Sequence, residues 1–331
     1  MRTLFGLGGL VTALGLALPL HAQAGAPALA LPLACVVGET CAVQHYVDRD
    51  PGPGVLDYRC QHRTYQAHNG VDIRLMTMAA QRAGVAVLAA APGRVARLRD
   101  GVPDISIRAP GAASVKGMEC GNGLVIDHGD GWETQYCHMA RGSIGVKVGE
   151  AVAAGKPIGK VGLSGDTEFP HLHFTVRHAG VVVDPFAPEP GAAPQACKAQ
   201  PSLWTAEAAR QLAYKSGEIL NAGWADRPVA DADIDGGGLA APSKASGVLV
   251  AYVRLIGLAQ GDEVELILTA PGGAVLAQAR NPPLDHDKDT YTAYVGRKLP
   301  AGGWPAGTYA AQFRILRTGK PVAAKTIKLA I

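Results

Sequence analysis

Charge and aromatic side chains are both scarce in this 331-residue chain. Charged residues make up 18% and aromatic residues 5%, and the formal net charge is only +3. So small a charge argues against a protein that holds nucleic acid through phosphate contacts. The 48% share of hydrophobic residues excludes an intrinsically disordered chain. Glycine and proline are plentiful, with 42 and 23 residues, which predicts turns and short strands rather than long helices.

Beyond the N-terminus, no segment is long and apolar enough to span a bilayer. The first 24 residues have the pattern of an export signal: Arg2 precedes an apolar run over residues 4–20, and a small-x-small cleavage pattern ends at Ala24. We therefore expect cleavage after Ala24 and a periplasmic or secreted protein with no transmembrane segment.

The sequence also lacks a Cys-x-x-Cys pair, which disfavours a thiolate metal site. Its six cysteines all follow the predicted cleavage site, at Cys35, Cys41, Cys60, Cys120, Cys137 and Cys197. An even number in an exported chain predicts three disulfides. The pair Cys35 and Cys41 is the first candidate, because Gly38 allows the chain between them to turn.

Helical periodicity is absent from residues 60–186, where strand-like runs alternate with turns. We expect an all-β fold: a Pro- and Gly-rich lead-in over residues 25–59, an antiparallel β-sheet domain over 60–186, and a Pro/Ala-rich linker with a short helix over 187–224. Short strands at regular spacing then predict a β-sandwich, resembling an immunoglobulin-like domain, over 225–331. That last segment contains one histidine and no cysteine, so no catalytic cluster is visible in it. We expect an accessory domain, either a structural appendage or a module that binds cell wall or a protein partner.

Eight of the nine histidines after the signal fall between His45 and His178. His68 and Asp72 would lie about 13 Å apart on a straight strand, too far to share one metal ion. The intervening Asn69-Gly70 is a strong turn former, and a turn would bring the imidazole and the carboxylate together.

His171 and His173 alternate with Leu172, so on a strand both side chains point to the same side. Either one could complete a set of two histidines and one aspartate, which leaves a zinc ion an open position for water. No His-Glu-x-x-His motif is present, so the usual glutamate base of helical zinc proteases is missing. Histidine is the natural substitute, and His138 lies on another predicted strand.

These three segments together resemble peptidase family M23, the lysostaphin- and LytM-like zinc enzymes. The first motif is His68-Asn69-Gly70-Val71-Asp72, the second is Tyr136-Cys137-His138, and the last is Pro170-His171-Leu172-His173-Phe174. The resemblance covers roughly residues 60–186. It implies one zinc ion per chain held by His68, Asp72 and His173, with His138 and His171 activating water and stabilising the oxyanion.

The resemblance further implies an exported zinc metalloendopeptidase that hydrolyses peptide bonds in peptidoglycan, with peptidoglycan peptides as its partners. Two alternatives are a non-catalytic regulator of cell-wall amidases with the same fold and a secreted protease acting on glycine-rich proteins. Two departures bear on the substrate groove: Phe169 precedes Pro170 where many relatives carry glycine, and a long loop runs from Asp100 to Cys120. The remaining histidines, among them His45, and the carboxylates Asp127, Asp130 and Glu133 are interpreted as surface or loop groups.

Overall fold

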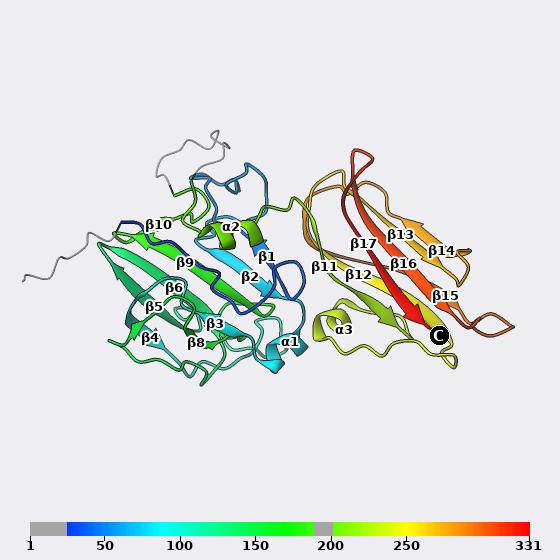
Figure 1. Ribbon diagram of the computed structural model, residues 1–331, viewed down its shortest axis with the longest axis horizontal. Helices are drawn as coiled ribbons and strands as arrows, with labels where there is room; N and C mark the ends of the chain where they lie inside the picture. Colours follow the sequence, from blue (N-terminus) through cyan, green and yellow to red (C-terminus); the bar gives the residue numbers. More distant parts are fainter. Residues whose placement is uncertain (1–24, 189–200) are drawn as a thin grey trace, which may run out of the picture.

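The computed structural model describes residues 25–188 and 201–331, which form two β-rich units (Figure 1). The predicted signal at residues 1–24, most of the Pro-rich part of the predicted linker and Cys197 lie outside the described residues. No helix among the described residues is long and apolar enough to cross a membrane.

One antiparallel sheet of eight strands forms the body of the first unit. Its strands are β1 (Cys41–His45), β2 (Val71–Leu75), β4 (Gly93–Arg99), β5 (Asn122–Gly129), β6 (Trp132–Met139), β7 (Ala151–Val152), β9 (His171–His178) and β10 (Val181–Val183). Their order is β1-β2-β9-β6-β5-β4-β7, and β10 pairs with β9. A separate pair joins β3 (Ala86–Leu88) to β8 (Pro157–Lys160), and α1 (Met78–Ala83) follows β2.

The centre of this sheet is apolar on the side that packs against the β3–β8 pair and the N-terminal segment. Ile73, Ile126, Leu172 and Phe174 are 0% exposed and belong to one core cluster. Alternation along β9 puts Leu172 and Phe174 into this core and turns His171 and His173 to the opposite face. The apolar core thereby orients the histidines.

The segment predicted as a lead-in is part of this core. Leu29 and Leu33 are at most 2% exposed. The Leu29 amide donates a hydrogen bond to the Leu203 carbonyl, and the Leu29 carbonyl accepts one from the Thr205 amide, so this segment pairs with residues that follow the large sheet in the chain. Strand β1, also in this segment, forms the edge of the large sheet next to β2. Thr205 caps α2 (Ala206–Gln211), the short helix expected in the linker.

The second unit is the predicted β-sandwich. One sheet has the order β11-β12-β15, with β11 (Glu218–Ala225), β12 (Val248–Leu258) and β15 (Lys288–Lys298). The other has the order β14-β13-β16-β17, with β13 (Glu263–Thr269), β14 (Val275–Arg280), β16 (Thr308–Arg317) and β17 (Lys320–Ala330). Strand β11 starts at Glu218, inside the stretch the sequence assigns to the linker. The helix α3 (Asp231–Gly236) was not expected, because six residues are too short to establish a helical period.

The two units pack against each other along β1, α1 and the sandwich (Figure 1). A small apolar cluster joins Ala42 of β1 to Leu220 and Ile256 of the sandwich. Arg82 of α1 donates to the Gly236 carbonyl at the end of α3, at 3.3 Å. Exposed His62 and Asp287 form an ion pair across the same junction at 2.7 Å. The sandwich is therefore docked onto the first unit.

Disulfides join Cys35 to Cys41, as the sequence predicts, and Cys120 to Cys137. Cys60 is also disulfide-bonded. The first bond closes the loop that precedes β1, and the second ties the end of the long loop 100–120 to β6. Covalent bonds of this kind persist in oxidising compartments.

Replacing Asp184 by asparagine should remove a pH dependence of stability. Burial raises the pKa of Asp184 from 3.8 to about 6, although its Oδ1 accepts a hydrogen bond from the Phe186 amide at 2.9 Å. An acid whose pKa rises on folding stabilises the fold below its unfolded pKa, and this contribution is lost as pH rises through the folded pKa. Between about pH 4 and about pH 7.5, the unfolding free energy of Asp184→Asn should therefore rise by roughly 2 kcal/mol relative to that of the wild type.

Urea unfolding at the two pH values, with a chelator present to hold metal binding constant, measures this difference. Asp130→Asn is the control, because Asp130 lies in an exposed turn with a φ of 48° that asparagine tolerates. A parallel pH dependence in Asp184→Asn and the wild type would contradict the prediction.

Candidate metal centre

All five residues singled out from the sequence meet on one face of the large sheet. Asp72 lies on β2, His138 on β6, and His171 and His173 on β9, while His68 lies in the loop before β2. The strand register places Asp72 opposite His173, and His173 opposite Cys137, the neighbour of His138. Four of the five are at most 6% exposed, and His173 is partly buried.

One carboxylate oxygen lies at the middle of this cluster. Asp72 Oδ1 is 2.9 Å from His173 Nδ1 and 3.2 Å from His68 Nε2. His171 Nε2 lies 3.4 Å from the same oxygen. Three imidazole nitrogens, two from β9 and one from the loop before β2, therefore converge on a single buried anionic atom.

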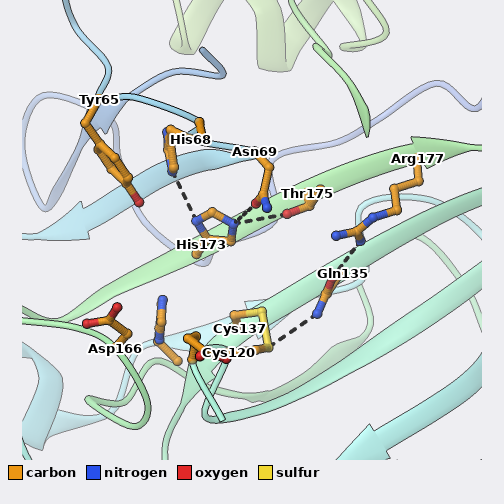
Figure 2. Close-up of a pocket in the computed structure, with 13 residues that line it drawn as sticks. Tyr65, His68, Asn69, Cys120, Gln135, Cys137, Asp166, His173, Thr175 and Arg177 are labelled. Atoms are coloured by element: carbon orange, nitrogen blue, oxygen red, sulfur yellow. Dashed lines mark hydrogen bonds between the residues drawn. A yellow bond between two sulfur atoms is a disulfide. The ribbon is translucent and has the colours of Figure 1, made fainter. Parts of the chain in front are cut away.

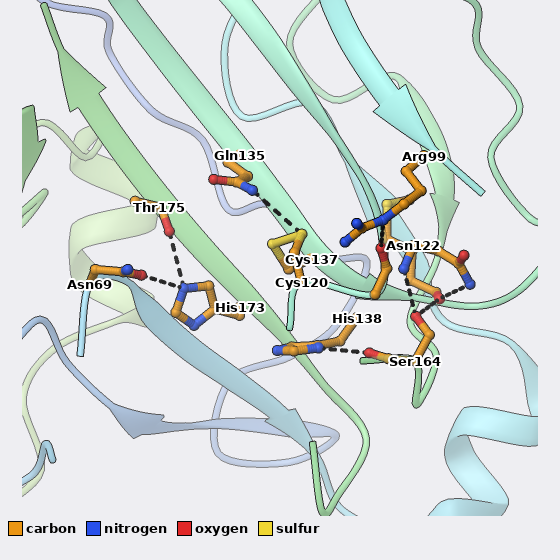
Figure 3. The surroundings of a disulfide bond; sticks show 12 residues. Asn69, Arg99, Cys120, Asn122, Gln135, Cys137, His138, Ser164, His173 and Thr175 are labelled. Carbon is orange, nitrogen blue, oxygen red and sulfur yellow. Dashed lines mark hydrogen bonds between the residues drawn. A yellow bond between two sulfur atoms is a disulfide. The ribbon is translucent and has the colours of Figure 1, made fainter. Parts of the chain in front are cut away.

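Backbone carbonyls orient three of the four rings. His68 Nδ1 lies 2.7 Å from the Tyr46 carbonyl oxygen, and His138 Nδ1 lies 2.8 Å from that of Ser164 (Figure 3). His171 Nδ1 lies 2.9 Å from the Phe169 carbonyl oxygen. A carbonyl only accepts, so each Nδ1 carries the hydrogen. Each Nε2 then presents its lone pair toward the cluster, ready to bind a metal or a proton.

His173 has the opposite arrangement, with Nδ1 toward Asp72. Its Nε2 lies 3.0 Å from Asn69 Oδ1 and 3.1 Å from Thr175 Oγ1 (Figure 2). Gly70 allows this, because a Cβ there would lie 2.6 Å from His173 Nε2. Gly70 forms a bend rather than the tight turn expected from Asn-Gly, and the positive φ of this segment falls on Ala67. The glycine is needed for close approach of the ring.

His138 has an uncommon backbone conformation. Its φ is 60°, a left-handed value that a non-glycine residue adopts only when its surroundings enforce it. Its amide donates to the Cys120 carbonyl at 2.8 Å, and the neighbouring Cys137 is disulfide-bonded to Cys120 (Figure 3). The end of loop 100–120 thus holds His138 in place.

Electrostatics match the geometry. Burial alone would raise the pKa of Asp72, but the nearby His68 and His171 and hydrogen bonds from His171 and His173 hold it well below its usual range. Burial and the adjacent His171 and His173 lower the pKa of His138 well below its usual value. Burial also lowers the pKa of His173, against the opposing effect of Asp72. Carboxylates bind a metal in the ionised form and imidazoles in the neutral form, and the lowered pKa values of Asp72 and His173 favour these forms.

His45, interpreted from the sequence as a group without partners, contacts this cluster. It is 7% exposed on β1, and its Nδ1 lies 3.1 Å from Asp72 Oδ2. Burial would lower the pKa of His45, but the carboxylates of Asp289 and Asp72 outweigh it and raise the pKa. The sequence signal that could have found His45 is weak, because only the pairing of β1 with β2 brings it opposite Asp72.

A cavity of about 330 Å³ opens over the histidines (Figure 2). It is polar, and its lining includes His68, His138 and His173 together with Tyr65, Ala67, Asn69, Glu119, Cys120, Gln135, Cys137, Asp166, Thr175 and Arg177. Asp166 and Arg177 lie on opposite sides of His173 in this view. The side-chain oxygen Oε1 of Gln135 accepts a hydrogen bond from Arg177 Nη1 at 2.6 Å, which directs the guanidinium along the cavity wall.

The two departures noted in the sequence both lie next to the cluster. The end of loop 100–120 supplies Glu119 and Cys120 to the cavity lining. The Phe169 ring lies 4.8 Å from the His171 ring and under the guanidinium of Arg74, 4.1 Å from its centroid. The carboxylates Asp127, Asp130 and Glu133 do not line the cavity, and Glu133 pairs with exposed Arg97.

The residues present fit a zinc ion. Donor atoms of His68, Asp72 and His173 all lie within 4.8 Å of one another, and so do those of His138, His171 and His173. Two histidines and one carboxylate form a common catalytic zinc set, and every imidazole has its second nitrogen already held. The donor distances leave the choice between the two groups open, and His173 belongs to both.

A β-sheet that presents buried His and Asp donors at the floor of an open polar cavity defines a candidate metal centre. Residues 66–185 match the model of peptidase family M23, so the chain carries a domain of that family.

The cell division protein DipM of Caulobacter vibrioides is 34% identical over 125 residues, which make up 38% of this chain and 17% of DipM. Among solved structures, a zinc-containing peptidase from Vibrio cholerae is 27% identical, over 43% of this chain and 38% of that chain, with a TM-score of 0.28. The catalytic domain of the antimicrobial peptidase lysostaphin from Staphylococcus simulans is 23% identical, over 43% of this chain and 85% of that chain, with a TM-score of 0.28.

Replacing Gly70 by alanine should weaken zinc binding at least about tenfold, the effect typical of disturbing groups that hold a ligand. The added Cβ would lie 2.6 Å from His173 Nε2 and 2.9 Å from the Phe174 carbonyl, so the ring must move. Competition with a chromophoric chelator measures the affinity. Gly145→Ala is the matched control, because its Cβ would meet nothing within 4 Å. Equal zinc affinity in the two variants would show that His173 does not need Gly70.

Proposed function

We propose that this protein is an exported zinc-dependent endopeptidase that hydrolyses peptide bonds in peptidoglycan stem peptides or cross-links. The observation that carries the proposal is the convergence of three imidazoles on Asp72 Oδ1, next to an open cavity that His138 also lines. Membership in peptidase family M23 supports peptide hydrolysis. The disulfides support an oxidising compartment outside the cytoplasm.

His68, Asp72 and His173 are proposed to hold the zinc ion. When bound, zinc would polarise a substrate carbonyl and lower the pKa of its bound water to about 7. The Asn69 and Thr175 side chains keep His173 in place, and the Tyr46 carbonyl keeps the Nε2 of His68 turned inward. Little rearrangement of the chain is then needed on metal binding.

His138 and His171 are proposed to handle protons and charge. Their rings lie 4.6 Å apart beside the three proposed ligands. His138 is neutral at physiological pH because its pKa is lowered, so its Nε2 can accept the proton of the attacking water. Either Nε2, once protonated, can donate to the oxygen that becomes negative as the carbonyl is attacked.

The cavity suits an extended peptide. It is polar and open, with Glu119 and Asp166 on one part of its wall and Arg177 on another. A peptide that carries both ammonium and carboxylate groups, as peptidoglycan stems do, complements such a wall. Because the net charge of the chain is only +3, we attribute attachment to the wall to this groove or to the sandwich.

Alanine variants should separate the two proposed roles. His68→Ala and Asp72→Ala should lose both zinc and activity, since each removes a ligand. His138→Ala and His171→Ala should keep most of the zinc and lose about 10²- to 10⁴-fold in turnover, the typical worth of general acid–base catalysis. Mass spectrometry of the metal content and peptide hydrolysis rates measure both effects. Loss of zinc in His171→Ala would instead assign His171 as a ligand.

Digestion of purified peptidoglycan tests the function itself. The zinc-loaded protein should release products whose masses identify one cleaved peptide bond, and His138→Ala should release almost none. A regulator of cell-wall amidases is the second candidate, because the curated relative is described as a cell division protein. Stoichiometric zinc with cross-linked muropeptides and glycine-rich peptides left uncut, together with stimulation of an added amidase, would favour the regulator.

A further inference from the structure

His45 lies between the proposed zinc ligand Asp72 and the second domain. In the pairing of β1 with β2 it is opposite Asp72, just after a register shift that follows Val43. Its Nδ1 lies 3.1 Å from Asp72 Oδ2, whereas the other oxygen, Oδ1, faces His68, His171 and His173. The two oxygens of one carboxylate are therefore divided between the metal centre and His45.

The contact to Oδ2 is a directed hydrogen bond. A carboxylate only accepts, so His45 Nδ1 is the donor. Asp72 is 2% exposed, and the described part of the chain supplies no other hydrogen bond to Oδ2. The Tyr65 ring meets the His45 ring edge-on at 5.2 Å, which limits rotation of the imidazole. Without His45, the Asp72 carboxylate would be held through Oδ1 alone.

The sandwich contacts the opposite side of the same ring. His45 Nε2 lies 3.6 Å from Asp289 Oδ1 on β15, within ion-pair distance though longer than a hydrogen bond. The neighbouring residue strengthens this junction, because Gln44 Nε2 donates to the Asp289 backbone carbonyl at 3.0 Å. Asp289 is thereby fixed beside β1 by a contact that does not involve its own side chain.

We propose that His45 is a positioning residue that fixes the carboxylate of Asp72 for metal binding, and that Asp289 of the sandwich holds His45 in that position. The sandwich would then contribute to the metal centre of the first domain. This inference rests on the proposed zinc site, and it adds a role for a domain that contributes none of the proposed ligands.

Zinc affinity of the full-length protein, measured by chelator competition, tests the first part. His45→Leu should bind zinc about 10- to 100-fold more weakly, the usual effect of removing a group that holds a metal ligand. His45→Asn should recover most of the affinity, because its side-chain amide can donate to Asp72 from nearly the place of Nδ1. Cobalt substitution gives a second readout, since the visible spectrum should change in His45→Leu and return in His45→Asn.

The exposed ion pair of His62 and Asp287 provides matched controls at the same domain junction, because it does not contact Asp72. His62→Leu and Asp287→Asn should leave zinc affinity and the cobalt spectrum unchanged. Asp289→Asn should weaken zinc binding about threefold or more, a smaller loss than that of His45→Leu because it acts through His45. Thermal unfolding of the metal-free proteins reports any general loss of stability.

Zinc affinity in His45→Leu equal to that of His62→Leu would overturn the positioning role, and so would a His45→Asn variant that binds no better than His45→Leu. An Asp289→Asn variant that matches Asp287→Asn would overturn the contribution of the sandwich. If His45→Leu does not fold, the positioning role is overturned by a His45→Asn variant that binds zinc tenfold more weakly than wild type. Wild-type protein that binds no zinc would overturn both this inference and the proposed function, whereas unchanged variants beside a zinc-loaded wild type overturn only the inference.

Discussion

A buried, ionised carboxylate is the group on which the rest of this site depends. Asp72 is 2% exposed, and a buried charge without partners is strongly unfavourable. Its Oδ1 has three imidazole nitrogens within 3.4 Å, and its Oδ2 faces His45. The cost of leaving a buried polar group unpaired is about 1–3 kcal/mol and more for a charge, so these neighbours stabilise the ionised carboxylate in the folded protein.

Strand order brings these partners to the carboxylate. Strand β9 lies between β2 and β6, so the His-x-His segment is flanked by Asp72 on one side and by the end of β6 on the other. The alternation of β9 buries Leu172 and Phe174 in the core, and this anchors both histidines on the opposite face. Backbone carbonyls and the Asn69 and Thr175 side chains then set the direction of each ring. Position comes from the sheet, and orientation comes from the groups behind it.

The second domain is docked close to this centre. Leu220 and Ile256 of the sandwich pack on Ala42 of β1, and Gln44 bonds to the backbone of Asp289. Because β1 is paired directly with β2, a displacement of the sandwich would be transmitted to the strand that carries Asp72. The domain supplies none of the candidate metal ligands, but it lies beside the candidate metal centre in space.

Local patterns in the sequence determined much of this protein. The turn residues and the two-residue alternation predicted an all-β fold, and the spacing of His68, Asp72, His138, His171 and His173 identified a set that the structure brings together. The short Cys35–Cys41 spacing also predicted a disulfide that is present. Tertiary structure alone decided that His45 lies beside Asp72, that Asp289 approaches His45, and that β11 belongs to the sandwich. The physical reason is that periodicity and turns are properties of neighbouring residues. Contacts between distant segments, in contrast, depend on which strands pair and in what register.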